Sequence, residues 1–346
     1  MLIYWIMYLI PATFALIFTQ KQKLVKIILV YTGFIFSLII GFRYNIGSDW
    51  SQYYNHYIDV KEISFLEIFD RSGDYGHLII NWIFAKLDLG IYGVNFIYII
   101  IFLIGLIKFC NKEQNPWIAM SVATPYLITV VAMGLTKQSV ALGFVLIGIN
   151  YLRDKKFINF SLLIICGALF HNSAIIMLFL LLLDKNIKIK TRILFIMLFS
   201  IILFIFLTQN FASMYEIYID RGLKSEGIYS RLILNLIPIP FLLIYRKKWK
   251  KNYNDYHIWY WFSFVTIISI FFIPISSTLI DRILIYFIPL QLVVYSRLPF
   301  LLKYIIRPIY TKLAIITCYG ATHFIWLYFS NHSKAWLPYK SILFYD

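Results

Sequence analysis

The chain has 346 residues, of which 61% are hydrophobic and 14% are charged, and its mean hydropathy is +0.77. A soluble globular domain carries about 25% charged residues, so this composition excludes that class. The formal net charge is +16, but the basic residues are spread over short segments between apolar runs, which does not indicate a nucleic-acid interface. The three cysteines (Cys110, Cys166 and Cys318) form neither a zinc-binding spacing nor a disulfide framework.

Apolar runs follow one another along the chain, and many approach the ~20 residues that a helix needs to cross the ~30 Å hydrocarbon core. Backbone groups must be hydrogen-bonded internally within lipid, so these continuous runs predict helices and argue against barrel strands. We therefore predict an all-α polytopic membrane protein with about twelve transmembrane helices. The expected spans are 2–19, 27–42, 91–108, 117–133, 135–152, 158–170, 173–184, 193–211, 232–245, 258–275, 283–300 and 313–330. The apolar segment 77–89 is too short to span and predicts a re-entrant or interfacial helix.

Lys and Arg concentrate in alternate loops of this topology, for example Lys21–Lys26, Arg153–Lys156 and Arg246–Lys251. The positive-inside rule assigns such loops to the cytoplasm, which leaves both termini on the outer side. A single transmembrane domain is expected to cover residues 1–346. Its outer loops 43–90, 212–231 and 276–282 and its tail 331–346 are expected to contribute to a functional site.

Polar and charged residues gather on these outer connections. They include Arg43, Asp49, Tyr53, His56, Asp74, His77, Lys137, Gln138, His171, Arg221, Arg231, Asp281, Arg282 and Tyr286. The cytoplasmic loops carry no phosphate-binding glycine loop and no paired-acid nucleotide–metal motif, so any chemistry is expected to face outward. Lys137 lies between two apolar runs, where an unpaired amine is costly. Arg43 could instead be an interfacial anchor, and His171 could be satisfied by a helix end.

Several of these residues form an ordered pattern. Arg43, Gly47, Ser48, Asp49 and Tyr53 fit R-x3-G-[ST]-D-x3-Y at the end of the second expected span. The pair Lys137-Gln138, the turn Phe170-His171-Asn172-Ser173 and the group Asp281, Arg282 and Tyr286 follow in order. Together they resemble the EpsG-like branch of Wzy-type polysaccharide polymerases, over most of the chain. That family usually has Arg before the Gln, and Lys137 keeps the charge but loses the bidentate fork.

The resemblance implies a GT-C-like membrane glycosyltransferase in the bacterial inner membrane. It would join oligosaccharide repeat units carried on undecaprenyl pyrophosphate, at the outer face, to make O-antigen, capsule or exopolysaccharide. The donor is already activated, so neither a cofactor nor a metal is expected. Expected partners are the lipid-linked oligosaccharide, the bilayer and a chain-length regulator protein, and no nucleic acid.

Two tasks remain for the side chains of such an enzyme. Cations stabilise the leaving pyrophosphate, for which the candidates are Arg43, Lys137, Arg282, Arg221 and Arg231. A base takes the acceptor proton, for which the candidates are Asp49 and His171. Tyr53, Gln138, Asp281 and Tyr286 are expected to bind substrate.

A lipid-linked oligosaccharide flippase and an O-antigen ligase remain as alternatives, with a membrane acyltransferase and a scaffolding protein behind them. A flippase is expected to have a polar cavity that reaches the cytoplasmic half, often between related halves.

Overall fold

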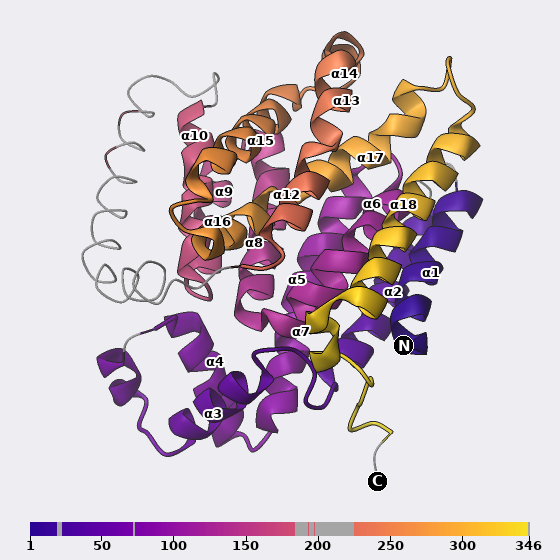
Figure 1. Ribbon diagram of the computed structural model, residues 1–346. Helices are drawn as coiled ribbons and strands as arrows, with labels where there is room; N and C mark the ends of the chain where they lie inside the picture. The colour runs from indigo at the N-terminus through magenta and orange to yellow at the C-terminus, as the bar shows by residue number, and fades with distance from the viewer. Residues whose placement is uncertain (19–22, 72, 184–192, 194–196, 198–224, 345–346) are drawn as a thin grey trace.

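The computed structural model describes residues 1–346 apart from 19–22, 72, 184–192, 194–196, 198–224 and 345–346 (Figure 1). Within the described residues every regular element is a helix, and one isolated β-bridge joins Arg43 to Ser341. The predicted all-α fold class is therefore confirmed. The expected span 193–211 lies almost entirely outside the described residues.

The first half of the chain forms two helices, an excursion of short helices, and then three long helical segments, which are separated at residues 113–115 and at Leu135. The helices are α1 (Leu2–Ile17), α2 (Lys23–Gly41), α3 (Trp50–Lys61), η1 (Leu66–Asp70), α4 (Tyr75–Lys86), α5 (Gly90–Lys112), α6 (Pro116–Ala123), η2 (Thr124–Val131), α7 (Ala132–Gly134) and α8 (Thr136–Arg153). In Figure 1, α3 and α4 lie at the lower end of the molecule, below the main helical body.

The second half contains more short helices. They are α9 (Phe157–Ala168), η3 (Asn172–Leu178), α10 (Phe179–Leu183), α12 (Ile228–Leu236), α13 (Pro238–Ile244), α14 (Arg246–Asn252), α15 (Tyr256–Ser269), η5 (Ile270–Phe272), α16 (Ser277–Leu284), η6 (Ile285–Phe287), α17 (Pro289–Leu301), α18 (Pro308–Phe329) and η7 (Asn331–Ala335). Proline begins α6 and α18 after non-helical residues, where its missing N–H costs nothing because a first-turn N–H has no partner within the helix.

α5 is packed between α2 and α8, and α9 covers the far side of α8. The contact between α5 and α8 depends on two glycines, since a Cβ on Gly105 would lie 2.2 Å from the carbonyl oxygen of Gly143. Small residues allow helix backbones to approach in this way where lipid supplies no hydrophobic driving force. The segment Pro116–Gly134 is the most enclosed of the four long apolar helices, with 94% of an 18-residue stretch buried, and it packs against α1, α17 and α18.

Four described helices are long and apolar enough to cross a membrane: Lys23–Gly41, Gly90–Lys112, Pro116–Gly134 and Ser277–Leu301. A fifth results if Ile228–Ile244 and Arg246–Asn252, which are bent by 80°, count as one span. The predicted number of about twelve is thus not confirmed. Other apolar runs form shorter helices of 10–17 residues, such as Leu2–Ile17 and Phe157–Ala168.

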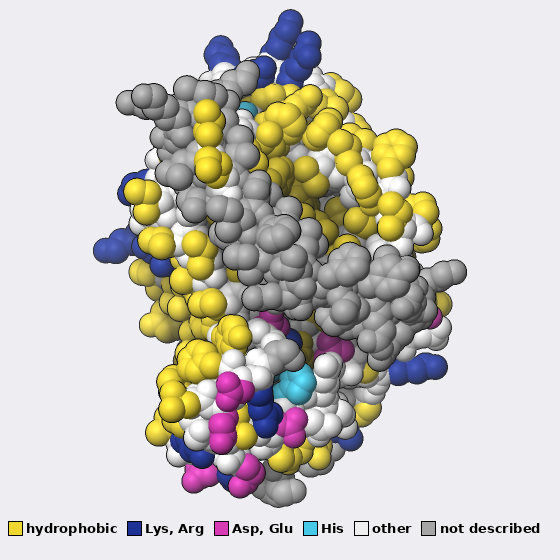
Figure 2. Space-filling model, turned by 90° about the vertical axis from the view of Figure 1, so that its left-hand side faces the viewer, with side chains coloured by type: hydrophobic (Ala, Val, Ile, Leu, Met, Phe, Trp, Pro, Cys, Tyr) yellow, Lys and Arg dark blue, Asp and Glu magenta, His cyan; other side chains and the backbone are white. Residues whose placement is uncertain are grey.

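The segment predicted to be re-entrant or interfacial forms the 12-residue helix α4, which packs against α3 and α5. Figure 2 shows acidic side chains gathered at this lower end of the molecule. Basic side chains project from the opposite end, and hydrophobic side chains cover much of the surface between them. The described structure therefore has an acidic end that contains α3 and α4.

Candidate functional site

The break before α8 places Lys137 at the acidic end. Pro125 lacks an N–H, and the chain forms a π-helical stretch over Thr124–Val131 before Leu135 leaves helical geometry at φ −112° and ψ 59°. α8 then begins at Thr136, so Lys137 lies in its first turn. A cation there is disfavoured by the positive end of the helix dipole and needs a compensating anion.

Asp74 supplies that anion. Its Oδ2 atom lies 2.9 Å from Lys137 Nζ, and the two side chains are 13% and 22% exposed. Asp74 is the N-cap residue of α4, where an aspartate usually accepts a bond from its own helix, but its side chain makes no such bond. It accepts instead from the backbone N–H of Asn172, at 3.4 Å. Its carboxylate is thus directed away from its own helix and toward α8 and η3.

His171 forms the N-cap of η3, as the helix-end interpretation allowed. Its Nδ1 accepts from the backbone N–H of Ser173 at 3.4 Å and lies 2.8 Å from Ser173 Oγ. An amide can only donate, so Nδ1 is unprotonated and the ring proton is on Nε2. Tyr286 Oη lies 3.2 Å from Ser173 Oγ and completes a chain of hydrogen bonds. Burial lowers the pKa of His171 to about 4, with Asp74 opposing that shift and Arg282 adding to it, so the ring is neutral at pH 7.

Gln138 connects α8 to α16 through a hydrogen bond. Its Nε2 donates to the carbonyl oxygen of Arg282 at 2.7 Å. Burial raises the pKa of the Tyr53 hydroxyl and nearby Asp49 adds to that shift, whereas hydrogen bonds to Thr136 and the Lys137 backbone and the charge of Arg282 oppose it. The structure therefore brings together six of the predicted site residues. These are Tyr53, Lys137, Gln138, His171, Arg282 and Tyr286.

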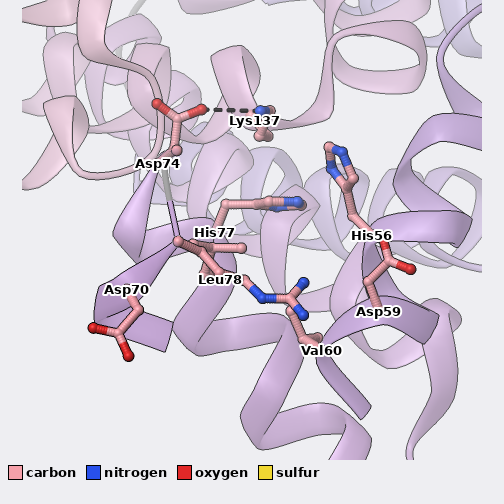
Figure 3. Close-up of a pocket in the computed structure, with 10 residues that line it drawn as sticks. His56, Asp59, Val60, Asp70, Asp74, His77, Leu78 and Lys137 are labelled. Carbon is pink, nitrogen blue, oxygen red and sulfur yellow. Dashed lines mark ion pairs between the residues drawn. The ribbon is translucent and has the colours of Figure 1, made fainter. Parts of the chain in front are cut away.

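A pocket of about 490 Å³ opens beside the Lys137–Asp74 pair (Figure 3). It is lined by α3, by the η1–α4 connection and by the starts of α4 and α8. Its titratable lining residues are His56, Asp59, Asp70, Arg71, Asp74, His77 and Lys137. Among the described residues, no group of three or more His, Cys, Asp or Glu side chains is arranged to hold a metal ion.

The two histidines of the pocket are neighbours, with ring centroids 5.7 Å apart. His77 is 2% exposed, and its Nδ1 lies 2.8 Å from the hydroxyl of Tyr98. Burial lowers the pKa of His77 well below its usual value, and Lys137 lowers it further. Burial also lowers the pKa of His56, and Lys137 contributes in the same direction. Both rings are therefore neutral at pH 7 and can donate and accept hydrogen bonds.

Arg43 lies apart from the pocket lining and is only 1% exposed. Its Nη1 donates to the carbonyl of Ile40 at 2.7 Å, and its Nε donates to those of Ile46 and Met133 at 3.3 and 3.2 Å. Gly47 sits against the same Met133 carbonyl at φ +104°, where a Cβ would come within 2.5 Å of that oxygen. In this conformation Arg43 fastens its loop to α7, and its guanidinium is closed to a substrate outside.

The C-terminal tail also meets this loop. The backbone N–H of Tyr44 donates to Lys340 at 2.9 Å, and that of Ile342 donates to Phe42 at 3.0 Å. Asp49 is half-buried at the N-cap of α3, where it accepts from Ser48 Oγ at 3.0 Å. The tail and Asp49 thus lie beside the Arg43 loop, outside the pocket lining.

Arg231 and Asp281 form an ion pair with each other, and Ser225 Oγ donates to Asp281 at 3.0 Å. The guanidinium of Arg231 also lies 5.5 Å from the ring centroid of Tyr126. Arg231 is on α12, and Asp281 is on α16 directly before Arg282. Neither residue of this pair lines the pocket described above. Arg221, a further candidate cation, lies outside the described residues.

Asp74, His56 and His77 are prominent in the pocket, although sequence reasoning gave them no role. They were visible only as polar residues of the first outer loop. The only sequence signal for Asp74 was its position between Gly73 and the apolar run that forms α4. In the structure Gly73 has a φ of +144°. An acidic residue at such a position is expected to cap, and only the structure shows that it does not.

A family model described as the EpsG family matches residues 26–341, which include every residue of this site. The chain belongs to the EpsG family. This confirms the resemblance read from the sequence and indicates, in general terms, a role as a polysaccharide polymerase of the Wzy-like kind. No curated protein and no solved structure matches the chain. The geometry of this EpsG-family member must therefore be interpreted from its own residues.

Proposed function

We propose that this EpsG-family chain is a metal-independent glycosyltransferase that polymerises oligosaccharide repeat units carried on undecaprenyl pyrophosphate. It acts at the outer face of the bacterial inner membrane, with both termini on that side. The observation that carries the proposal is the Lys137–Asp74 pair, whose charged atoms lie 2.9 Å apart in the lining of an open pocket at one end of an apolar helical body. A twelve-span, GT-C-like topology stays a prediction.

The reaction transfers the growing glycan from its lipid pyrophosphate to a hydroxyl of the next lipid-linked unit. The bond from the anomeric carbon to the phosphate oxygen breaks, and its electron pair leaves with the pyrophosphate. Cations near the departing oxygen stabilise that charge. Lys137 and Arg282 are both close enough to His171 for their charges to lower its pKa, so they are the cations assigned to the pyrophosphate. Arg43 instead fastens its own loop to α7 from inside the protein.

A flippase must carry a polar headgroup through the membrane, and it is expected to expose polar groups toward both ends. The charged cluster at the opposite end of α8 contains Glu113, Arg153, Asp255 and Arg297, and these residues are paired with one another. They are at most 8% exposed. This arrangement supports a reaction at the acidic end over passage between the ends.

Deletion of the gene in its source bacterium tests the proposal, with surface and lipid-linked glycans separated by size on a gel. Loss of long polymer, with single repeat units still reaching the surface, is the expected result. A ligase would give a different result, since polymer would still form on the lipid carrier but would not be attached to its final acceptor. Accumulation of lipid-linked units in the inner leaflet would identify a flippase and contradict the proposed polymerase. A chain-length regulator partner is expected to change the modal length in the same assay.

A further inference from the structure

The pocket beside Asp74 has the size of a small-molecule site. Its volume of about 490 Å³ falls within the roughly 300–1,000 Å³ typical of such sites. It is formed by one continuous stretch, α3 to α4, together with Lys137 at the start of α8. Nothing in the proposed handling of the pyrophosphate uses the α3 side of this pocket.

The charge of the lining is unfavourable for a phosphate. Three carboxylates, those of Asp59, Asp70 and Asp74, face two basic side chains, those of Arg71 and Lys137. Lys137 is already paired with Asp74. A pyrophosphate would be repelled by the remaining carboxylates. A sugar ring has no such penalty, and its hydroxyls can both donate to carboxylates and accept from cations.

The histidines point to a ligand with hydroxyl groups. His56 lines the pocket, is half-buried and carries a neutral ring, so it can donate to or accept from a ligand hydroxyl. Figure 3 shows the His77 side chain extending across the pocket toward the helix that carries His56. Two adjacent imidazoles with both donor and acceptor atoms fit a polyhydroxylated ring well.

Asp74 is the lining carboxylate best placed to act on such a ring. Its orientation is fixed by Lys137 on Oδ2 and by the Asn172 N–H on Oδ1, while its 13% exposure leaves it reachable from the pocket. His171 is less suitable because its lone pair on Nδ1 is occupied by Ser173. Asp49 is not part of the lining.

We propose that this pocket binds the terminal sugar of the acceptor unit, without its pyrophosphate, and that Asp74 is the general base of the transfer. The acceptor oxygen forms its bond to the anomeric carbon of the donor as its proton passes to Asp74. The lipid pyrophosphate leaves on the Lys137 and Arg282 side with the electron pair of the broken bond. His56 and His77 determine which sugar is accepted. This inference rests on the proposed polymerase function.

The base role is tested with the purified full chain in detergent, lipid-linked repeat units as donor, and the repeat-unit oligosaccharide freed of its lipid as acceptor. Asp74→Asn is expected to lower kcat at least 100-fold, in the range that general base catalysis supplies. The matched control is Asp88→Asn, an 86% exposed aspartate outside the pocket, which should keep the wild-type rate.

Because Asp74→Asn also weakens the contact with Lys137, Asp74→Ala is assayed with added sodium formate. Recovery of rate by formate supports a base, and wild-type kcat in Asp74→Asn would overturn the role.

The acceptor pocket is tested by His56→Ala in the same assay. One lost hydrogen bond predicts a KM for the free oligosaccharide raised about tenfold, with the KM for the lipid-linked donor unchanged. An increase in donor KM alone would overturn the inference and make the pocket a donor site. If the wild-type chain forms no product from lipid-linked units, the proposed polymerase itself fails. If it does polymerise and both variants behave as wild type, only this inference fails.

Discussion

The two ends of α8 carry charged clusters of opposite character. Lys137 begins the helix and is paired with Asp74 beside an open pocket. Arg153 ends it, about 24 Å away at 1.5 Å per residue, and joins Glu113, Asp255 and Arg297 in a network with no exposed member. One cluster is accessible and the other is sealed.

The sealed network satisfies nearly every charged atom. Arg297 binds Asp255 through two bonds of 2.8 and 2.7 Å and donates to Glu113 at 3.0 Å. Arg153 donates to the other Glu113 oxygen at 2.7 Å. The guanidinium of Arg297 also lies 4.1 Å from the ring centroid of Tyr253. Burial would raise the pKa of Asp255, but the Arg297 bonds and charge hold it well below its usual range.

This difference separates structural charge from functional charge. A bidentate, fully compensated network leaves little hydrogen-bonding capacity for a ligand. A pair with exposure on both members can exchange partners when a substrate enters. The same residue types therefore stabilise the fold at one end of α8 and remain available for chemistry at the other.

The largest effect is expected from breaking the sealed network. Arg297→Ala leaves Glu113 and Asp255 with a single cation between them in a buried setting. Removing one partner of a buried ionic network costs about 3–5 kcal/mol, so the free energy of unfolding should fall by that amount. Thermal unfolding in detergent measures it. Arg246→Ala, an exposed arginine at the same end, is the control and should leave the melting temperature unchanged. An unaltered Arg297→Ala melting temperature would show that the network contributes nothing.

Acidification is expected to act first on His171, which lies near the Lys137–Asp74 pair. The folded pKa of His171, about 4, lies below the value of about 6.5 in an unfolded chain. Between these values the unfolded state binds more protons, so the free energy of unfolding falls as the pH drops from about 6.5 to about 4. The contribution of His171 is roughly 3 kcal/mol over that window. Asp255, by contrast, remains ionised through the same window.

Thermal unfolding at pH 7 and pH 4.5 measures this effect in the wild type and in His171→Asn. Asparagine can still cap η3 but does not titrate. The variant should lose less stability on acidification than the wild type does. Some pH dependence should remain in the variant, because burial also lowers the pKa of His77. Equal pH dependence in the two proteins would mean that His171 is not buried in its neutral form.

The sequence was sufficient for the fold class because long apolar runs in lipid leave the backbone no alternative to helix. The number of spans stays a prediction. The bend of 80° between Ile244 and Arg246, and the break at Leu135, depend on packing against other helices, and hydropathy does not report packing. Arg153 was likewise interpreted from sequence only as part of a basic cytoplasmic loop, because its pairing with Glu113 and Asp255 joins helices far apart in the chain.

In the candidate site, too, some features could be predicted from the sequence and others depend on how the helices pack. Lys137, Gln138, His171 and Tyr286 were named from an ordered pattern, and the structure brings them together, although their roles stay predictions. The pocket itself could not be predicted. It exists because α4 folds back so that Asp74 reaches α8, and because Asp74 leaves its own helix uncapped. Sequence spacing carries no signal for either fact.

The smallest effect on stability is expected at Lys137. Lys137→Met removes the charge but keeps the length of the side chain, and Asp74 then faces a pocket open to water. The free energy of unfolding should fall by less than the roughly 3 kcal/mol expected for a buried ionic network, because both members of the pair are partly exposed, while polymer formation should fall at least tenfold. Lys137→Arg keeps the charge and should support polymer of normal length. A loss of stability in Lys137→Met as large as that of Arg297→Ala would place Lys137 with the structural charges, and the distinction between the two ends of α8 would fail.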